Sequence, residues 1–336
     1  MLRSMSGHQF ENRFGALALL LLGTVAAGAG CGQESGYLQN PFDPAAGTAT
    51  LVTSPGQLDA SVPHLKLTMV DVGQGDGFVL ELPSGVVVAV DGGPDRTGSY
   101  SDFIAGLPRV DYVILSHPHS DHYTGLPNAI ARLPDDCTAR VFDPGYDRPD
   151  IGGYQYYKNA AGCRYRPTGK GMSLSLDPMV ATTVVGAADA PYPTTDGWGI
   201  NNTSLITHVR YGSFSIVLSG DAQTDAEQRV YADHMILRAN VMKIGHHGSC
   251  NATGTTFLKS IAPDVALISA ADNNDFGHPH CQTLAKLKAQ GSAWYRTDTN
   301  GLVTVESDGQ RFAVTTSKGK ASDPTCPRPC GWPSDF

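Results

Sequence analysis

Short apolar runs separated by glycine-rich turns are the dominant pattern along this chain. Runs that alternate with period two, or that are apolar throughout, predict strands. We expect strands at residues 65–70, 78–82, 86–90, 110–115, 179–185, 205–211, 214–218, 241–244, 265–269, 302–306 and 312–315. We expect helices at 126–133, 224–235, 255–261 and 283–289; Thr224-Asp225-Ala226-Glu227 has the pattern of a capping box.

The order of these elements indicates the fold class. Antiparallel pairs at both ends of the chain enclose a stretch in which strands and helices alternate. This order predicts an α/β domain in which two mixed sheets face each other and helices cover their outer faces.

The first thirty residues have the features of an export signal. Arg3 and Arg13 precede an apolar run at 16–27, which is too short to span a bilayer comfortably. Gly28-Ala29-Gly30-Cys31 resembles a lipoprotein cleavage site that would leave Cys31 lipidated as a membrane anchor; ordinary signal cleavage is the alternative. We therefore expect a signal peptide at 1–30, a flexible linker at 31–63, a hydrolase domain at 64–316 and a C-terminal tail at 317–336.

Charge and cysteine content refine this picture. The whole chain carries a net charge of −8, and loss of residues 1–30, with two arginines and one glutamate, leaves −9. Such acidity is unlike the basic face of most nucleic-acid-binding proteins. Six cysteines follow Cys31, and an even number in an exported chain indicates disulfides. We expect the pairs Cys137–Cys163, Cys250–Cys281 and Cys326–Cys330; a zinc site at the last two is the less favoured alternative.

The densest chemical signal is Ser116-His117-Pro118-His119-Ser120-Asp121-His122, which directly follows a predicted buried strand. Nitrogen and oxygen ligands this close together can hold two metal ions, with His117 and His119 pointing one way and Asp121 and His122 the other. Zinc accepts both ligand types. The alternative is a surface loop that happens to be rich in histidine.

Further histidines and aspartates follow other predicted strands. Each of five motifs combines glycine with a histidine or an aspartate at a strand end: Asp71-Val72-Gly73-Gln74-Gly75-Asp76, Asp91-Gly92-Gly93, Ser219-Gly220-Asp221, Lys243-Ile244-Gly245-His246-His247-Gly248-Ser249 and Gly277-His278-Pro279-His280. Singly, each is a weak signal, since strand-ending Asp-Gly is usually a hairpin. Together they predict a metal cluster built along one sheet edge.

These motifs, with Asn201-Asn202-Thr203-Ser204-Leu205, resemble the metallo-β-lactamase superfamily in type and order. Within it the resemblance is to the hydrolase domain of the ComEC-type competence proteins, and it covers about residues 65–316. The resemblance implies a four-layer αββα sandwich with two divalent metal ions. Zinc is the favoured metal, and manganese is the alternative.

The resemblance also assigns roles to individual residues. It implies metal ligands at His117, His119, Asp121, His122, Asp221 and one of His246 and His247, of which we favour His246. Supporting positions would be Asp71, Asp76, Asp91, Asn201 and Ser204, with Asp91 orienting a ligand histidine. Many members have another histidine between the Asp121-His122 and Asp221 elements. Here that region reads Asn201-Asn202-Thr203-Ser204, so a single metal ion, or weaker binding of the first ion, is the alternative.

The expected activity is hydrolysis by a metal-bridging hydroxide, with phosphodiesters as the favoured substrates. Asp121 or Asp221 would accept the proton of the water, and His278, His280 or Lys243 would contact a phosphate or protonate the leaving oxygen. A structural role for His278 and His280 is an equal alternative. The expected partners are a phosphate-ester substrate, with DNA as one candidate, and the membrane through Cys31; no obligate protein partner is evident.

Two other functions remain open. One is a phosphocholine esterase or lactonase with the same metal centre. The other is a non-catalytic lipoprotein that captures DNA or cell-wall phosphates. Residues 143–170 interleave tyrosines with lysines and arginines, a composition suited to stacking on nucleobases, although a solvated insert is the favoured interpretation.

Overall fold

The computed structural model describes residues 45–146, 148–187, 197–232 and 237–331, all within a compact unit that spans Leu38–Phe336. The predicted signal peptide, Cys31 and the first part of the predicted linker lie outside the described residues. Within the described ranges, no helix is long and apolar enough to cross a membrane.

The first sheet has nine strands. Their order is β1 (Thr50–Leu51), β16 (Arg311–Thr316), β15 (Val303–Ser307), β2 (Leu65–Met69), β3 (Gly77–Glu81), β4 (Val87–Gly92), β5 (Tyr112–Ile114), β6 (Val141–Asp143) and β7 (Tyr165–Pro167). The pairs from β16 to β4 are antiparallel, whereas β4 to β7 run parallel.

The second sheet has seven strands and is also mixed. Their order is β14 (Ala293–Arg296), β13 (Val265–Ile268), β12 (Val241–Lys243), β11 (Phe214–Leu218), β10 (Ile206–Tyr211), β9 (Val180–Gly186) and β8 (Ser173–Asp177). The strands from β11 to β14 run parallel, and those from β8 to β11 are antiparallel.

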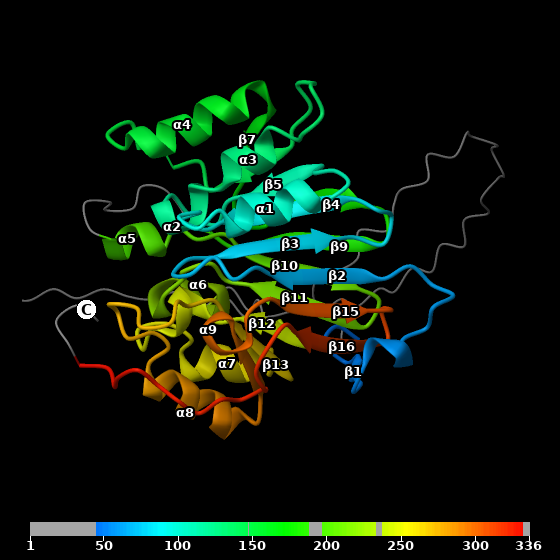
Figure 1. Cartoon of the computed structure of the whole chain (residues 1–336), viewed down its shortest axis with the longest axis vertical. Helices are drawn as coiled ribbons and strands as arrows, with labels where there is room; N and C mark the ends of the chain where they lie inside the picture. Colours follow the sequence, from blue (N-terminus) through cyan, green and yellow to red (C-terminus); the bar gives the residue numbers. More distant parts are fainter. Residues whose placement is uncertain (1–44, 147, 188–196, 233–236, 332–336) are drawn as a thin grey trace, which may run out of the picture. The chain divides into compact units, whose positions relative to one another are not determined.

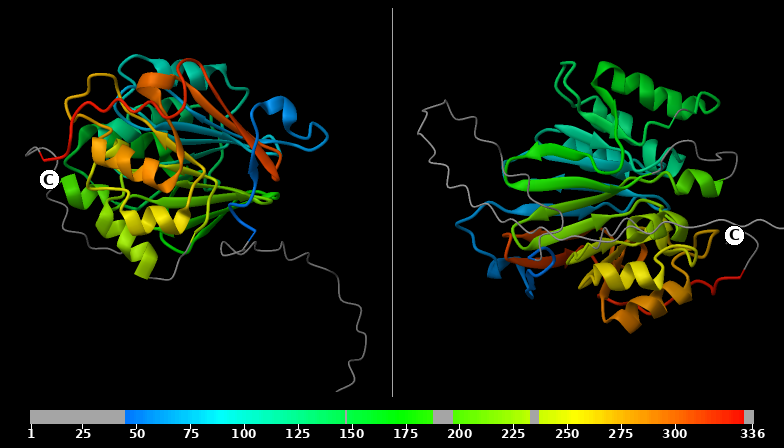
Figure 2. Two further views of the ribbon diagram at one scale, coloured as in Figure 1. Left: turned by 90° about the horizontal axis from the view of Figure 1, so that it is seen from below. Right: turned by 180° about the vertical axis from the view of Figure 1, so that it is seen from behind.

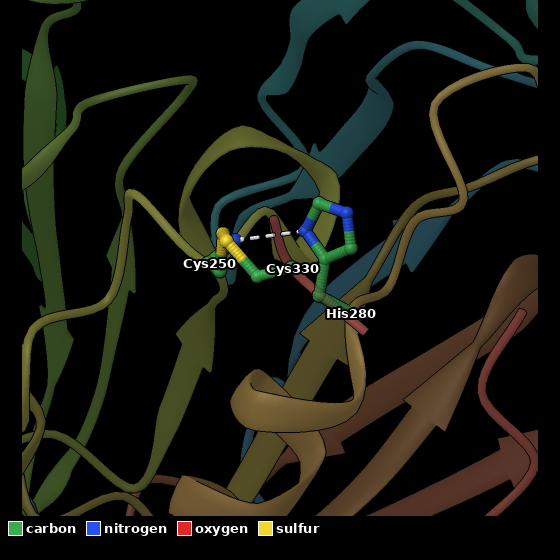
Figure 3. Close-up of side chains that lie close together, drawn as sticks. All are labelled: Cys250, His280 and Cys330. Carbon is green, nitrogen blue, oxygen red and sulfur yellow. Dashed lines mark hydrogen bonds between the residues drawn. A yellow bond between two sulfur atoms is a disulfide. The ribbon is translucent and has the colours of Figure 1, made fainter. Parts of the chain in front are cut away.

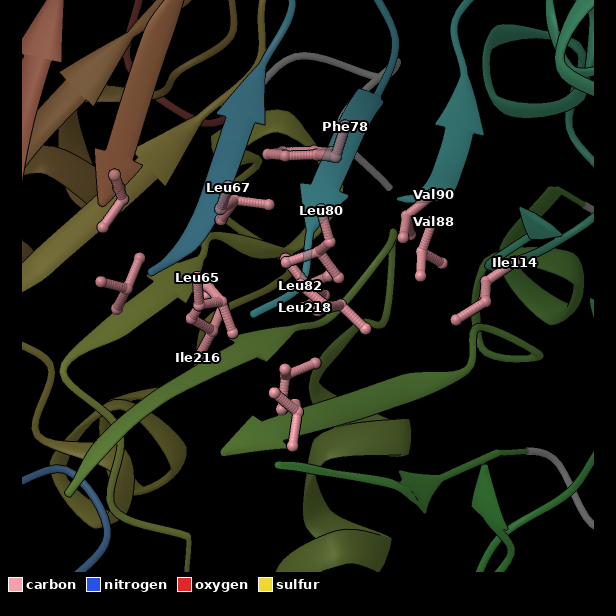
Figure 4. Close-up of a cluster of buried hydrophobic side chains, with 14 of the residues drawn as sticks. Leu65, Leu67, Phe78, Leu80, Leu82, Val88, Val90, Ile114, Ile216 and Leu218 are labelled. Carbon is pink, nitrogen blue, oxygen red and sulfur yellow. The ribbon is translucent and has the colours of Figure 1, made fainter. Parts of the chain in front are cut away.

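A continuous apolar core joins the two sheets (Figure 4). Because successive strand residues point to opposite faces, Leu65 and Leu67 of β2, and Phe78 and Leu80 of β3, all enter this core. Ile216 of β11 comes from the second sheet and belongs to the same cluster. Burial of these side chains holds the sheets face to face.

Helices cover the outer faces (Figures 1 and 2). A second apolar cluster joins the outer face of the first sheet to α1 (Ser99–Gly106), α3 (Leu126–Ile130) and α4 (Gly152–Ala161). A third joins the second sheet to α6 (Thr224–Ala232), α7 (Thr255–Ile261) and α8 (Cys281–Gln290). The layers are therefore helix, sheet, sheet and helix, which confirms the predicted α/β four-layer αββα sandwich.

The structure contains several helices and strands that were not predicted. Strands β6, β7, β8 and β14 and helices α1 and α4 were not predicted. Part of the predicted linker packs on the domain: β1 pairs in parallel with β16, and Ala49 enters the core between the sheets. The capping box at the start of α6 is not formed as predicted, because the Glu227 carboxylate binds the backbone of another loop instead.

Two of the three predicted disulfides are wrong. Cys137–Cys163 is confirmed, but the other pairs are Cys250–Cys330 and Cys281–Cys326. The reason is the course of the tail, which runs past the start of α8: the Cys281 N–H donates to the Arg328 carbonyl at 3.3 Å. Each tail cysteine therefore faces a loop of the domain and not its sequence neighbour.

We predict that removing one of these bonds destabilises the domain substantially. The Cys281–Cys326 bond spans 45 residues, and restricting the unfolded chain over such a loop is worth about 4 kcal/mol. C281S/C326S should lower the free energy of unfolding by about 2–4 kcal/mol in denaturant titrations without reductant. C137S/C163S, which closes a shorter loop, is the matched comparison. An unchanged midpoint for C281S/C326S would contradict the assigned pairing.

Candidate metal centre

The candidate site lies where parallel strands of both sheets end. Asp91 is the second-to-last residue of β4, and the segment from His117 to His122 follows β5, its parallel neighbour. Asp221 follows β11, and His246 and His247 follow β12, again a parallel pair. Because parallel strands bring their carboxyl ends to one edge, these segments meet across the two sheets.

One carboxylate oxygen is the centre of this arrangement. Asp221 Oδ2 lies 3.3 Å from the Nε2 atoms of both His122 and His247. It lies 3.9 Å from Nε2 of His117 and 4.0 Å from Nε2 of His246. Four imidazoles from two sheets therefore point the same nitrogen at a single buried oxygen.

A glycine makes this convergence sterically feasible. Gly220 has a φ of +50°, a backbone conformation that residues other than glycine rarely adopt. A Cβ at this position would lie 2.6 Å from Cβ of Ser116. The absence of a side chain thus lets the strand end that carries Asp221 approach the histidine loop.

The donor atoms fit divalent metal ions. Asp121, His122, Asp221 and His247 each offer one ligand atom, and the four atoms lie within 4.8 Å of one another. The Nε2 atoms of His122 and His247 are buried and make no hydrogen bond to any described residue. A buried nitrogen without a partner is costly unless a cation fills the gap, and a set of two imidazoles and two carboxylates suits zinc.

A second pair of nitrogens lies beside this group. His117 Nε2 and His119 Nδ1 are 3.0 Å apart. His117 is fully buried, whereas His119 is partly exposed. These two nitrogens thus lie together, and neither belongs to the group that contains Asp121 and His122.

Outer contacts fix the orientation of the ligands. The His122 Nδ1–H donates to Asp91 Oδ2 at 2.8 Å, so its Nε2 lone pair faces Asp221. The His247 Nδ1–H donates to the Ser269 carbonyl at 2.9 Å with the same effect. Ser204 Oγ accepts the backbone N–H of Asp221 at 3.0 Å. Such partners set the tautomer of a ligand and strengthen its binding to a metal.

Lys243 forms ion pairs with two carboxylates of the cluster, those of Asp76 and Asp221. Its ammonium group is 2.6 Å from Asp76 Oδ2 and 3.4 Å from Asp221 Oδ1, and it donates to the Gly220 carbonyl at 2.7 Å. The side chain is only 1 % exposed. All three ammonium hydrogens have partners inside the protein, so Lys243 positions Asp76 and Asp221. The prediction that Lys243 contacts a substrate is therefore wrong.

The electrostatics of the cluster favour a cation at its centre. Burial alone would raise the pKa of Asp221, but the charges of His247, His122 and Lys243 hold that pKa well below its usual range. Burial opposes charge on His122 too, yet Asp221, Asp91 and Asp121 raise its pKa well above that of a free histidine. The buried carboxylates thus favour positive charge at the centre of the cluster, which a bound metal ion would supply.

His278 lies at the rim of the cluster with a partner that was not predicted. Its ring centroid is 5.3 Å from that of His246, and Nδ1 accepts a hydrogen bond from the Gln74 amide at 3.4 Å. The proton is therefore on Nε2. Burial and the neighbouring imidazoles lower the pKa of His278 to about 2, so this residue is suited to donating a hydrogen bond and not to supplying a proton.

Two predicted site residues lie elsewhere. Asp71 is on the wall of a separate surface cavity, beside Ser99 and Leu302. His280 is fully buried, and its Nδ1 accepts the backbone N–H of Cys250 at 3.0 Å, beside the Cys250–Cys330 bond (Figure 3). The sulfur atoms of Cys250 and Cys330 are bonded to each other and are not available as metal ligands. His280 therefore has a structural role at the loop and does not join the metal cluster.

The tyrosine-rich segment is largely part of the core. Tyr154 and Tyr157 of α4 are fully buried and stack against each other at 5.6 Å. The Lys158 ammonium lies 3.3 Å from the ring centroid of Tyr165. Tyr156, in contrast, is 67 % exposed. Most of these rings are therefore engaged within the domain and do not form a surface for stacking on bases.

Comparison with known proteins agrees with this geometry. The sequence pattern described as the Metallo-beta-lactamase superfamily matches residues 68–135. The chain is 28 % identical over 263 residues to ComE operon protein 3 of Bacillus subtilis, a match that covers 71 % of this chain and 32 % of that protein. Recombination protein 2 of Haemophilus influenzae is 26 % identical over 269 residues, covering 78 % and 31 % respectively. The matches thus span about a third of the length of these relatives.

A solved structure of a mutant CmlA beta-hydroxylase shares the fold, with a TM-score of 0.50 and 14 % identity, covering 71 % of this chain and 53 % of that one. Residues 68–135 therefore match the metallo-β-lactamase superfamily, and the fold agrees with that match. Within this class its relatives are the ComEC-type competence proteins, as the motifs predicted.

We predict that Asp91 is needed for tight metal binding. D91N removes the charge that orients His122 and strengthens it as a ligand, and loss of such a partner costs about 10–100-fold in metal affinity. Competition titration of zinc against a chromogenic chelator measures the change. D71N, at a position away from the cluster, should bind zinc like the original chain. Equal affinities for D91N and D71N would contradict the role assigned to Asp91.

A separate prediction concerns pH and Glu227, which supports the loop after the histidine pair. Its carboxylate accepts the backbone N–H groups of Thr253 and Gly254 at 2.6 and 2.7 Å. Burial raises the pKa of Glu227 from 4.5 to about 7. The folded chain therefore takes up a proton that the unfolded chain has lost, and this contribution to stability disappears as the pH rises from about 4.5 to about 7.

The expected size is about 3 kcal/mol, at about 1.4 kcal/mol per pKa unit. The free energy of unfolding of the original chain should fall relative to that of E227Q between pH 5 and pH 8. Denaturant titrations of both proteins at the two pH values measure the difference, in which all other titrating groups cancel. Parallel pH profiles would contradict the assignment.

Proposed function

We propose that the protein is a metal-dependent phosphodiesterase of the nuclease type. The observation that carries the proposal is the convergence of four imidazoles on Asp221 Oδ2. Such an arrangement suits a pair of divalent cations, and we propose zinc, with manganese as the alternative. When bound, two such ions lower the pKa of a water molecule and stabilise charge on phosphoryl oxygens.

The residues of the chain then have distinct tasks. Asp221 would be shared between the two ions, and Asp91 holds His122 in the tautomer that a ligand needs. Asp121 is the most exposed carboxylate of the group, with a side chain 32 % exposed, and is therefore best placed to take a proton at the surface of the cluster. The His278 Nε2–H would donate a hydrogen bond to a non-bridging phosphate oxygen.

The relatives favour DNA as the first substrate to test. One of them is named a recombination protein and another a competence protein. The acidic charge of the chain and the buried tyrosines of α4 give no independent support for a nucleic-acid surface. We therefore propose phosphodiesters as the substrate class, with DNA as one member.

We also propose that the enzyme works outside the cytoplasm. The support comes from the sequence of residues 1–31, which has the features of a lipoprotein signal, and from three disulfides in the described part of the chain. Disulfides persist in oxidising compartments. Cys31 would then be the site of a lipid anchor.

The decisive measurement is hydrolysis by the metal-loaded protein. Linear single- and double-stranded DNA and bis(p-nitrophenyl) phosphate should be cleaved, and H119A/D121A should lose at least about a thousandfold in rate, as expected when metal-held transition-state stabilisation is removed. Chelator treatment should abolish the activity, and zinc or manganese should restore it.

A substrate panel separates this proposal from its competitors. Turnover of p-nitrophenylphosphorylcholine or of a lactone, with none of DNA or bis(p-nitrophenyl) phosphate, would replace the proposed substrate class. Bound metal with no turnover of any ester would indicate a binding protein and overturn the proposed activity.

A further inference from the structure

The two histidines of the 246–247 pair are not equivalent in the structure. His247 Nε2 lies 3.4 Å from Asp121 Oδ2 as well as 3.3 Å from Asp221 Oδ2. Its Nε2 therefore belongs to a group of four donor atoms with Asp121, His122 and Asp221. Four such atoms are enough for a tetrahedral metal ion. His246 Nε2 does not belong to that group, although it approaches the same Asp221 oxygen to 4.0 Å.

His117 and His119 belong to no such group among the described residues. His117 Nε2 and His119 Nδ1 lie 3.0 Å apart, and Asp221 Oδ2 is 3.9 Å from His117 Nε2. These residues supply three donors. The segment from which a further histidine could come begins at Asn201, whose amide lies 3.4 Å from His246 Nε2. The Asn201 amide and His246 Nε2 are therefore neighbours in the structure.

The backbone of the pair accounts for this reach. Neighbouring residues in a strand point to opposite faces, but His246 and His247 both have left-handed conformations, with φ of 47° and 53°. Their rings are 6.1 Å apart and inclined at 59°. The turn therefore directs both Nε2 atoms toward Asp221, from different directions.

Outer contacts prepare His246 as a ligand in the same way as its neighbours. Its Nδ1–H donates to Asn251 Oδ1 at 3.1 Å. The proton is therefore on Nδ1, and the Nε2 lone pair points toward Asn201 and Asp221. Partners of this kind are the usual second contacts of metal-binding histidines.

We propose that the pair is divided between the two metal ions: His247 joins Asp121 and His122 at one ion, and His246 joins His117 and His119 at the other. Asp221 is common to both sets. The inference rests on the two-metal centre of the proposed function, which it deepens by naming the missing ligand of the first ion.

Counting bound metal in single and double variants tests the division. Each protein is loaded with zinc, dialysed against a weak chelator and analysed by inductively coupled plasma mass spectrometry. The original chain should retain two ions. H246A, H119A and H119A/H246A should each retain one ion, because both residues serve the same ion. H246A/H247A should retain none. H278A, whose ring neighbours that of His246 but lies outside both sets, should retain two.

The proposal also predicts a rescue. Because the Asn201 amide contacts His246 Nε2, a histidine at 201 can reach the same position from its own segment. N201H/H246A should recover the second zinc ion that H246A loses. Melting temperatures recorded with excess chelator, where metal contributes nothing, show whether each variant is folded.

Three outcomes would overturn the division. They are two ions retained by H246A with unchanged affinity, loss of both ions from H119A/H246A, or a single ion retained by the original chain. A chain that retains two ions in the predicted pattern but cleaves no ester would refute the proposed activity and leave this inference standing.

Discussion

The buried carboxylate of Asp221 is the constraint on which the rest of the site depends. An ionised group out of water needs compensating charge and hydrogen bonds, and here it has Lys243 on one oxygen and four imidazole nitrogens around the other. Two of these histidines follow β5 of the first sheet and two follow β12 of the second. The site therefore exists only when the two sheets are packed, and the apolar core between them fixes its geometry.

Around Asp221, the hydrogen bond made by Nδ1 of each imidazole determines whether its Nε2 carries a free lone pair. Asp91, the Ser269 carbonyl and Asn251 each accept the Nδ1–H of a different histidine. Each contact leaves an Nε2 lone pair directed at Asp221. The residues that supply these contacts come from β4, from the end of β13 and from the loop after β12, so ligand orientation is distributed over much of the fold.

The covalent links of the tail bear on the same loops. Cys250 lies three residues beyond His247, and Cys281 lies directly after His280. Both are bonded to cysteines of the tail, at positions 330 and 326. The bonds restrict the conformations available to the segments that carry His246, His247 and His278, and thereby reduce the entropy lost when those side chains are ordered around an ion.

The sequence by itself determined the sandwich and the strand ends at which the clustered histidines and aspartates lie, because these follow from period-two burial and from the position of each motif after its strand. It missed β6 and β7, which have three residues each, and the edge strands β8 and β14 of the second sheet. It also could not pair the tail cysteines or separate His246 from His247. Those features depend on contacts between segments far apart in the chain, such as Arg328 with Cys281 and Asn201 with His246. Only the packed structure brings such segments to hydrogen-bonding distance, and so only the tertiary structure decides them.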